Sequence, residues 1–374
     1  MPRALFVSFQ GFLQSAKGGA QVCTTEYIDV IRAAGIDLTV LPFGLDRRPI
    51  TRALRQLNSS PYFRAFEPSL PSTVAGLVQQ TPFDFVFLNQ VSLATLASRI
   101  RPLLPEKCKI VVLSHGLEST DLLHFLRLRG RFPLRGRVRP TAASLLGSVL
   151  LAEAEVRTHV DIVCTLSPFD QDLEKWMGTR HAAWLPRIVK SNPLPWRPSG
   201  RRLGFVGTLD HSPNLEGLVA VLEALGEREL APFNVRVIGG PSEVGAWLAE
   251  RYACVDYLGA IDDTALAHEA ATWSAFLNPI FCQARGCSTK LAMALGWEIP
   301  IVTTPQGRRG YVWGKGELAE ARTPREFASL CMGLFDDEKA REAQEAVRLV
   351  TSTSPGMASV AQQLRGIVGL EPER

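Results

Sequence analysis

The sequence predicts an α/β protein made of two similar halves, each built around its own parallel sheet. Apolar runs of strand length alternate with segments of helical spacing, which is the chain order of parallel sheets. A proline-rich stretch at residues 186–200 interrupts this alternation once, and the pattern then restarts. With 374 residues and 46% hydrophobic content, the chain can bury the two cores that this arrangement requires.

The first half begins with a strand, a glycine-bearing loop, a helix and a second strand. Residues 4–8 are apolar and lead into the loop SAKGGAQ, residues 22–33 have helical spacing, and residues 37–42 are apolar again. Further strands are predicted at 85–89, 109–114 and 161–167, with a helix at 150–158. Ser167 followed by Pro168 is typical of a helix start, with the serine as cap and the proline in the first position.

The second half repeats this order after the prolines, which exclude an ordinary helix in the linker. Strands are predicted at 202–207 (RLGFVG), 234–240 (NVRVIGG) and 299–304 (IPIVTT), and a helix at 213–225 (PNLEGLVAVLEAL). Ser212 before Pro213 is again expected to cap a helix. We therefore expect a first domain at residues 1–190, a second at 191–356 and a hinge at 193–200.

Composition excludes several classes of protein. A net charge of +4 is too small to indicate a nucleic-acid-binding protein. The seven cysteines form no CxxC pair, which fits reduced thiols in a cytoplasm. No apolar run approaches the roughly 20 residues that span a bilayer, and the amino terminus lacks the cleavage site of a signal peptide. We expect a cytoplasmic protein.

The segment ARGCSTKLAMALG, residues 284–296, starts as a loop and continues as a helix with a lysine at its start. The macrodipole disfavours a cation at this end, so either Lys290 is solvated or a strongly negative group lies beside it. Gly286 allows close backbone approach, Ser288 and Thr289 offer hydroxyls or caps, and Lys290 offers charge. Together they favour a diphosphate-binding site.

Other candidates follow the predicted strands, because open parallel sheets bind ligands at the carboxyl ends of their strands. Gly19 lies after the first strand, and Gly207 and Thr208 lie at the corresponding place in the second half. His115 ends the apolar run KIVVLSH, where it can hydrogen-bond a sugar hydroxyl, assist proton movement or simply satisfy loop amides. Glu118, three residues further along the chain, is a second candidate for the same role.

These segments resemble family 4-type glycosyltransferases. The resemblance lies in GFVGTLDHSPNLEGL and NPIFCQARGCSTKLAMALGWEIPIVTTPQGRRGY, and in KGGAQ, SHGLES and AEAEVRTHVDIVCTLS of the first half. It implies the GT-B fold, two Rossmann-like domains facing each other across a cleft, with the final helix (residues 357–374) crossing back to the first domain. It also implies transfer of a sugar from a nucleotide diphosphate donor, UDP- or GDP-linked, with retention of configuration and without an essential metal or cofactor.

The resemblance implies one group of residues that bind the donor and a second group that acts in catalysis. The donor would be held by Gly19, Gly207, Thr208, Arg285, Gly286, Ser288, Thr289 and Lys290. His115 and Glu118 would be the catalytic candidates.

The chain departs from the family at one point. Two glutamates that many members carry eight positions apart fall on Arg285 and Met293, or on Gln283 and Leu291, depending on the anchor. Arg285 can instead grip a phosphate with its planar fork. The departure leaves open a second reading, a non-catalytic subunit that binds a partner. A nicotinamide dehydrogenase is disfavoured, because no GxGxxG follows a strand.

An arginine-rich segment, RLRGRFPLRGRVRP, interrupts the first half at residues 127–140. A solvated loop is one reading, and contact with anionic lipid or an acidic acceptor is the other. Its basic residues are Arg127, Arg129, Arg131, Arg135, Arg137 and Arg139. The expected acceptor is a glycan or a lipid-linked molecule, with peripheral contact at the inner membrane face.

Overall fold

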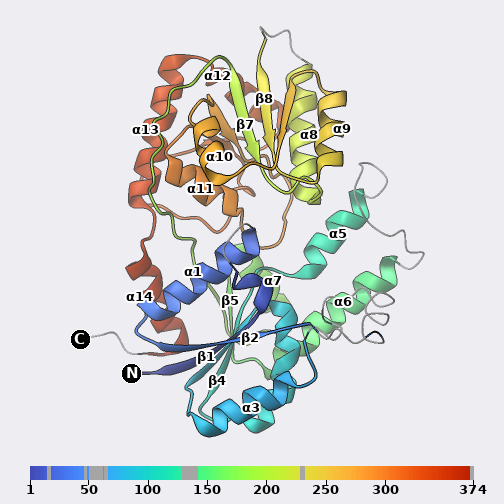
Figure 1. The fold of residues 1–374 in the computed structure, drawn as a ribbon, viewed down its shortest axis with the longest axis vertical. Helices are drawn as coiled ribbons and strands as arrows, with labels where there is room; N and C mark the ends of the chain where they lie inside the picture. The colour runs from blue at the N-terminus through green and yellow to red at the C-terminus, as the bar shows by residue number, and fades with distance from the viewer. Residues whose placement is uncertain are drawn as a thin grey trace.

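The protein contains two six-stranded sheets, each in its own half of the molecule (Figure 1). The computed structural model describes residues 1–14, 18–45, 49, 62, 66–128, 142–227 and 232–370. The first sheet contains β1 (Arg3–Phe9), β2 (Asp37–Phe43), β3 (Phe85–Asn89), β4 (Lys109–Leu113), β5 (Ile162–Thr165) and β6 (Ala182–Trp184). The second contains β7 (Arg202–Val206), β8 (Asn234–Ile238), β9 (Val255–Gly259), β10 (Ala275–Leu277), β11 (Ile301–Thr303) and β12 (Ala319–Glu320).

Every strand pair in both sheets is parallel. The strand order is β2-β1-β3-β4-β5-β6 in the first half and β12-β11-β10-β7-β8-β9 in the second. Both orders run outward from a central strand in two directions, so each half has a point where the strand order reverses. Ligands bind at such points in open parallel sheets. The α/β fold class with two Rossmann-like units is confirmed.

Helices cover both faces of each sheet, which explains why the central strands are continuous apolar runs. In the first half the helices are α1 (Gly19–Ala33), α3 (Leu70–Gln80), α4 (Ala97–Ile100), α5 (Glu118–Leu128), α6 (Ala142–Val156) and α7 (Pro168–Trp176). In the second half they are α8 (Ser212–Gly226), α9 (Ser242–Arg251), α10 (Asp263–Ala270), α11 (Thr289–Trp297), α12 (Pro324–Gly333) and α13 (Asp337–Thr353). No helix of these described segments is long and apolar enough to cross a membrane.

The alternation of side chains along a strand divides the first core into two layers. Leu5, Val86 and Val112 join one buried cluster, whereas their neighbours Phe6, Phe87 and Val111 join the other, on the opposite face. The second sheet is divided in the same way between two clusters.

The last helix, α14 (Met357–Val368), belongs to the first core although it follows the second half in sequence. It packs against α1, and Val360, Leu364 and Val368 are each at most 2% exposed in the cluster on that face. Figure 1 shows this helix in red beside α1, below α13. The chain therefore crosses between the halves twice.

The linker differs from the expected hinge at residues 193–200. Its amides donate to backbone carbonyls of the second half: Asn192 to Gly296, Leu194 to Trp297, Arg197 to Ala271 and Ser199 to Thr272. The Ile188 amide, by contrast, donates to Glu26 Oε1 of α1 at 3.2 Å. Residues 192–199 are therefore tied to the backbone of the second half, and these contacts do not support a hinge within 193–200.

Most predicted elements are present with shifted ends. The strand at 85–89 and the helix start at Ser167 are confirmed, and Ser167 Oγ accepts the amide of Asp170 at 3.1 Å. The first helix starts at Gly19, earlier than expected, and the helix expected at 150–158 begins at Ala142. The cap at Ser212 is wrong: His211 holds the cap position and Ser212 is already helical.

Candidate functional site

The carboxyl ends of the two sheets meet at the loop that precedes α11. Gly116, after β4, and Gly286, in that loop, both have left-handed φ angles, +95° and +61°. A Cβ on Gly286 would lie 2.7 Å from the carbonyl oxygen of His115, and a Cβ on Gly116 would clash with the amide of Gly286. The two loops therefore touch backbone to backbone, which only glycine permits here.

Lys290, the second residue of α11, is half-buried against groups of the second half. Its Nζ donates to Asn214 Oδ1 at 2.7 Å and lies 4.9 Å from the centroid of the Phe205 ring. Burial, with Arg309 nearby, lowers its pKa to about 7. The half-buried amine therefore contacts protein groups instead of lying free in solvent, and it has no acid opposite it among its described hydrogen-bond partners.

Glycines line both sides of this amine. A Cβ on Gly207, after β7, would lie 2.8 Å from Lys290 Nζ. A Cβ on Gly19, the first residue of α1, would lie 3.2 Å from Thr289 Oγ1. Thr289 and Lys290 thus face both halves of the molecule, and the first-turn amides of α11 lie at the same point.

Ser288 and Thr208, both expected to contact the donor, bond to neighbouring asparagines instead. Ser288 occupies the cap position of α11 without a capping bond, because its hydroxyl donates to Asn278 Oδ1 at 3.0 Å. Thr208 is exposed at the rim, and its carbonyl accepts from Asn214 Nδ2 at 2.8 Å. Ser288 therefore shapes the loop in this arrangement, and Thr208 holds the asparagine that contacts Lys290.

Arg285 and Glu118, expected to contact phosphate and to act in chemistry, are paired with each other across the two halves. Arg285 Nη1 contacts Glu118 Oε1, and its Nε lies 2.8 Å from Asp121 Oδ2. His211 Nε2 lies 3.2 Å from the same Asp121 oxygen. The two carboxylates raise the pKa of the guanidinium. This cluster fastens α5 to the loop before α11.

His115 is held as a neutral ring with a defined proton. Its Nε2 lies 3.0 Å from Asn89 Oδ1, while Asn89 Nδ2 donates to Ser8 Oγ and Thr24 Oγ1, both at 2.9 Å. Asn89 Oδ1 must then accept, so His115 Nε2 carries the proton and Nδ1 the lone pair. Burial, Arg285 and Arg187 lower the pKa of His115 to about 3.

Asp170, in the first turn of α7, accepts a hydrogen bond from the loop that precedes α11. Its Oδ1 accepts the amide of Gly286 at 3.2 Å, and burial raises its pKa to about 6. Sequence reasoning did not identify Asp170, Asn89 or Asn214 as site residues. Asn89 is the last residue of β3, so the rule that sites lie after strands could have found it. Asp170 and Asn214 lie in the first turns of helices, where capping is the ordinary explanation.

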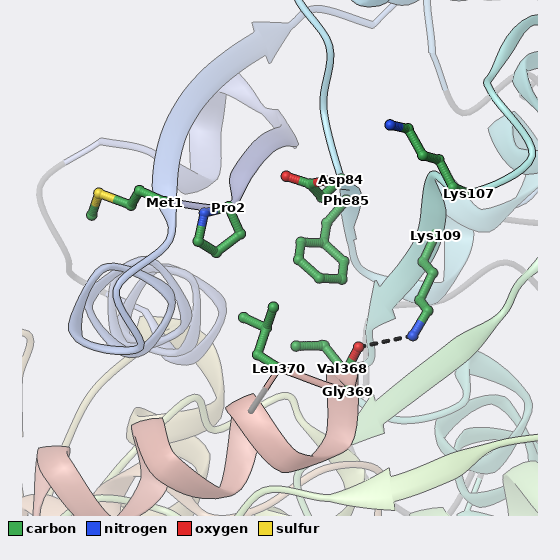
Figure 2. Close-up of a pocket in the computed structure, with 9 residues that line it drawn as sticks. All are labelled: Met1, Pro2, Asp84, Phe85, Lys107, Lys109, Val368, Gly369 and Leu370. Carbon is green, nitrogen blue, oxygen red and sulfur yellow. Dashed lines mark hydrogen bonds between the residues drawn. The ribbon is translucent and has the colours of Figure 1, made fainter. Parts of the chain in front are cut away.

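A separate pocket of about 400 Å³ lies at the amino ends of β1, β3 and β4 (Figure 2). Figure 2 shows Asp84 and Lys109 at its wall, with Lys109 Nζ bonded to Val368 O of α14 at 2.9 Å. It lies at the wrong end of the sheet for the loops described above, and we do not assign the donor to it.

The arginine-rich segment can be placed only at its first residue. Arg127 is exposed in the last turn of α5. Arg129, Arg131, Arg135, Arg137 and Arg139 lie outside the described residues.

Comparison with known proteins identifies the second half most directly. Residues 200–337 match the family model described as glycosyl transferases group 1. That range includes Gly207, Arg285 and Lys290. A search of curated proteins finds no match.

Solved structures resemble the whole chain in fold. They include sucrose-phosphate synthase from Thermosynechococcus elongatus (TM-score 0.66, 13% identity, 98% of each chain). Anabaena HepE, in complex with UDP and glucose, has a TM-score of 0.64 at 14% identity over 99% of this chain and 100% of that one. The lipopolysaccharide outer core galactosyltransferase WaaB, in its apo form, has a TM-score of 0.62 at 14% identity over 99% of each chain.

Identities this low establish the fold, and the family rests on the match of residues 200–337. The resemblance inferred from the sequence motifs is confirmed. Residues 200–337 match the group 1 glycosyltransferase family, and the whole chain has the GT-B fold of the solved structures.

Proposed function

We propose that the donor diphosphate binds at the start of α11, between Lys290 and the glycines that face it. The observation that carries this proposal is the half-buried amine of Lys290, which donates to Asn214 and has no acid among its described hydrogen-bond partners; desolvation and Arg309 lower its pKa to about 7. A diphosphate there would receive the charge of Lys290, the hydroxyl of Thr289 and the first-turn amides. Gly207 and Gly19 leave room for it, because a Cβ at either position would crowd Lys290 or Thr289.

The same groups serve the chemistry of transfer. As the bond between sugar and diphosphate breaks, negative charge grows on the leaving phosphate, and donors already aimed at that place stabilise it. Lys290 and the helix amides supply this charge stabilisation from the chain itself. We propose a retaining reaction that needs no metal for the transfer step.

His115 belongs to the loop after β4 that touches Gly286, and its Nδ1 is a hydrogen-bond acceptor. With Nε2 committed to Asn89, its Nδ1 can accept a hydrogen bond from a sugar hydroxyl. A pKa of about 3 makes it a positioning group rather than a general acid at neutral pH. Glu118 becomes available to substrate only if its ion pair with Arg285 opens.

We propose that residues 1–190 with the final helix hold the acceptor, and that residues 191–356 hold the donor. The acceptor is a glycan or a lipid-linked molecule, and Arg127, exposed in the last turn of α5, is one basic residue that can contact it. The resemblance to family 4-type enzymes supports this division, as does the presence of Lys290 in the matched half.

A panel of nucleotides and nucleotide sugars tests the proposal by thermal shift and calorimetry. One nucleotide sugar should stabilise the protein most, since stabilisation at fixed concentration grows with affinity. Slow hydrolysis of that same donor would then show that the site is catalytic. If no nucleotide or nucleotide sugar binds at millimolar concentration, the donor site is wrong and the non-catalytic subunit becomes the better reading.

A further inference from the structure

A second group of side chains joins the two halves beside the loop that precedes α11 (the donor loop). His124 comes from α5, Glu216 from α8, and Cys282 from the loop after β10. One nitrogen, carboxylate oxygen or sulfur atom from each lies within 4.8 Å of the other two. Within the described residues this is the one group of three such side chains that meets this criterion. Figure 1 shows α5 next to the first turns of α8, and the two helices are in contact.

The imidazole of His124 is oriented as a metal ligand. The side chain is 7% exposed, and its Nδ1 is buried without a hydrogen-bond partner. Its Nε2 lies 3.2 Å from the carbonyl oxygen of Gln283, which can only accept, so Nε2 carries the proton. In the neutral ring Nδ1 then holds the lone pair. A histidine whose second nitrogen donates to a backbone carbonyl is the usual arrangement in metal sites.

A buried polar atom without a hydrogen-bond partner costs free energy, and a ligand bound to Nδ1 would remove this cost. A carboxylate oxygen of Glu216 and the sulfur of Cys282 lie within 4.8 Å of a ring nitrogen of His124. We propose that His124 Nδ1, Glu216 and Cys282 bind one zinc ion that fastens α5 of the first half to α8 and the donor loop of the second. Nitrogen, sulfur and oxygen ligands together favour zinc, whereas magnesium and calcium prefer oxygen alone.

The geometry requires only a small adjustment. Zinc ligands at about 2.0–2.3 Å in a tetrahedron lie about 3.5 Å from one another, so groups within 4.8 Å close by about 1 Å on binding. Three protein ligands leave a fourth position for water. Because Cys282 and Gln283 directly precede the loop with Arg285 and Gly286, the ion would hold that loop against the first half. This role is separate from the transfer step, which stays without a metal.

Zinc binding can be measured directly on the full-length protein without a histidine tag. After chelator treatment and exchange into metal-free buffer, the protein is titrated with zinc chloride against a chromophoric chelator. One equivalent should bind. Cobalt(II) loaded into the same protein should show a thiolate-to-metal charge-transfer band, because Cys282 supplies the only sulfur in the proposed site. A protein that binds no equivalent of zinc, or a cobalt spectrum without a thiolate band, overturns the proposal.

Matched variants assign the site. Cys282→Ser should weaken zinc binding by more than about 100-fold, since loss of an outer-shell partner alone costs 10–100-fold. Cys254→Ser, a half-buried thiol elsewhere in the second half, should leave the affinity unchanged. Glu216→Gln keeps the shape of the side chain and should also weaken binding. Equal zinc affinity in Cys282→Ser and Cys254→Ser, with both proteins folded by circular dichroism, places the ion elsewhere and overturns the assignment.

Discussion

Replacing Lys290 by methionine removes the cation of the proposed donor site and keeps the length of the side chain. In the empty site Lys290 has a pKa of about 7, so at pH 7 about half of the amines are already charged. Completing the charge when a diphosphate binds therefore costs little at this pH. The variant should lose most of one charge-assisted interaction, about 1.5–3 kcal/mol, or about 10- to 150-fold in donor affinity.

The same pKa predicts how donor affinity depends on pH. A bound diphosphate raises the pKa of Lys290 above its empty-site value, so binding takes up a proton wherever the free amine is neutral. Affinity is therefore full below pH 7 and falls as the pH rises through 7 and beyond. With an empty-site pKa of about 7, the fall between pH 6 and pH 8 is about 10-fold. Lys290→Met should bind weakly and without this pH dependence.

Calorimetry with the best nucleotide sugar, whose diphosphate does not titrate near neutral pH, measures both effects. Lys315→Met is the matched control, because it removes the same charge from an exposed lysine of the second half. It should bind like the parent protein. Equal donor affinity in the parent and Lys290→Met at pH 6 refutes the donor-site argument. A pH dependence that survives in Lys290→Met shows that another group takes up the proton.

Four further predictions concern other parts of the site and the fold. The ring of His115, with a pKa of about 3, should stay neutral from pH 5 to 9 by NMR, and a titration near 6.5 would contradict its hydrogen bond to Asn89. Arg285→Ala should lower the free energy of unfolding by about 1–3 kcal/mol, because it removes the guanidinium partner of Glu118 and leaves Asp121 with His211 alone; an unchanged urea midpoint would show that the ion pairs contribute nothing. Met293→Glu should not raise donor hydrolysis, since it places a carboxylate against an apolar cluster, and a gain in rate would support a site that lost its glutamate. Leu364→Ala in α14 should cost about 2–5 kcal/mol in urea denaturation, and a loss below about 1 kcal/mol would argue against its burial in the first core.

The sequence alone was enough to predict the fold class, and it singled out Lys290 as the central residue of the proposed donor site. Strands covered on both faces must be apolar throughout, so β1, β3 and β4 stand out as continuous runs, and the linker prolines separate the two halves. Lys290 was found because it breaks a local rule, a cation at the positive end of a helix. Both signals are local, since they depend on spacing along one segment.

Only the tertiary structure decided what the other side chains do. Ser288 could cap α11 by its position, yet packing brings Asn278 within reach of its hydroxyl, and the two bond instead. Glu118 and Arg285 are far apart in sequence, and their pairing depends on how the two halves meet. The same is true of His124, whose partners come from the other half. Local spacing determines which residues lie on one helix or strand, whereas contacts between halves depend on the packing of surfaces that no short segment encodes.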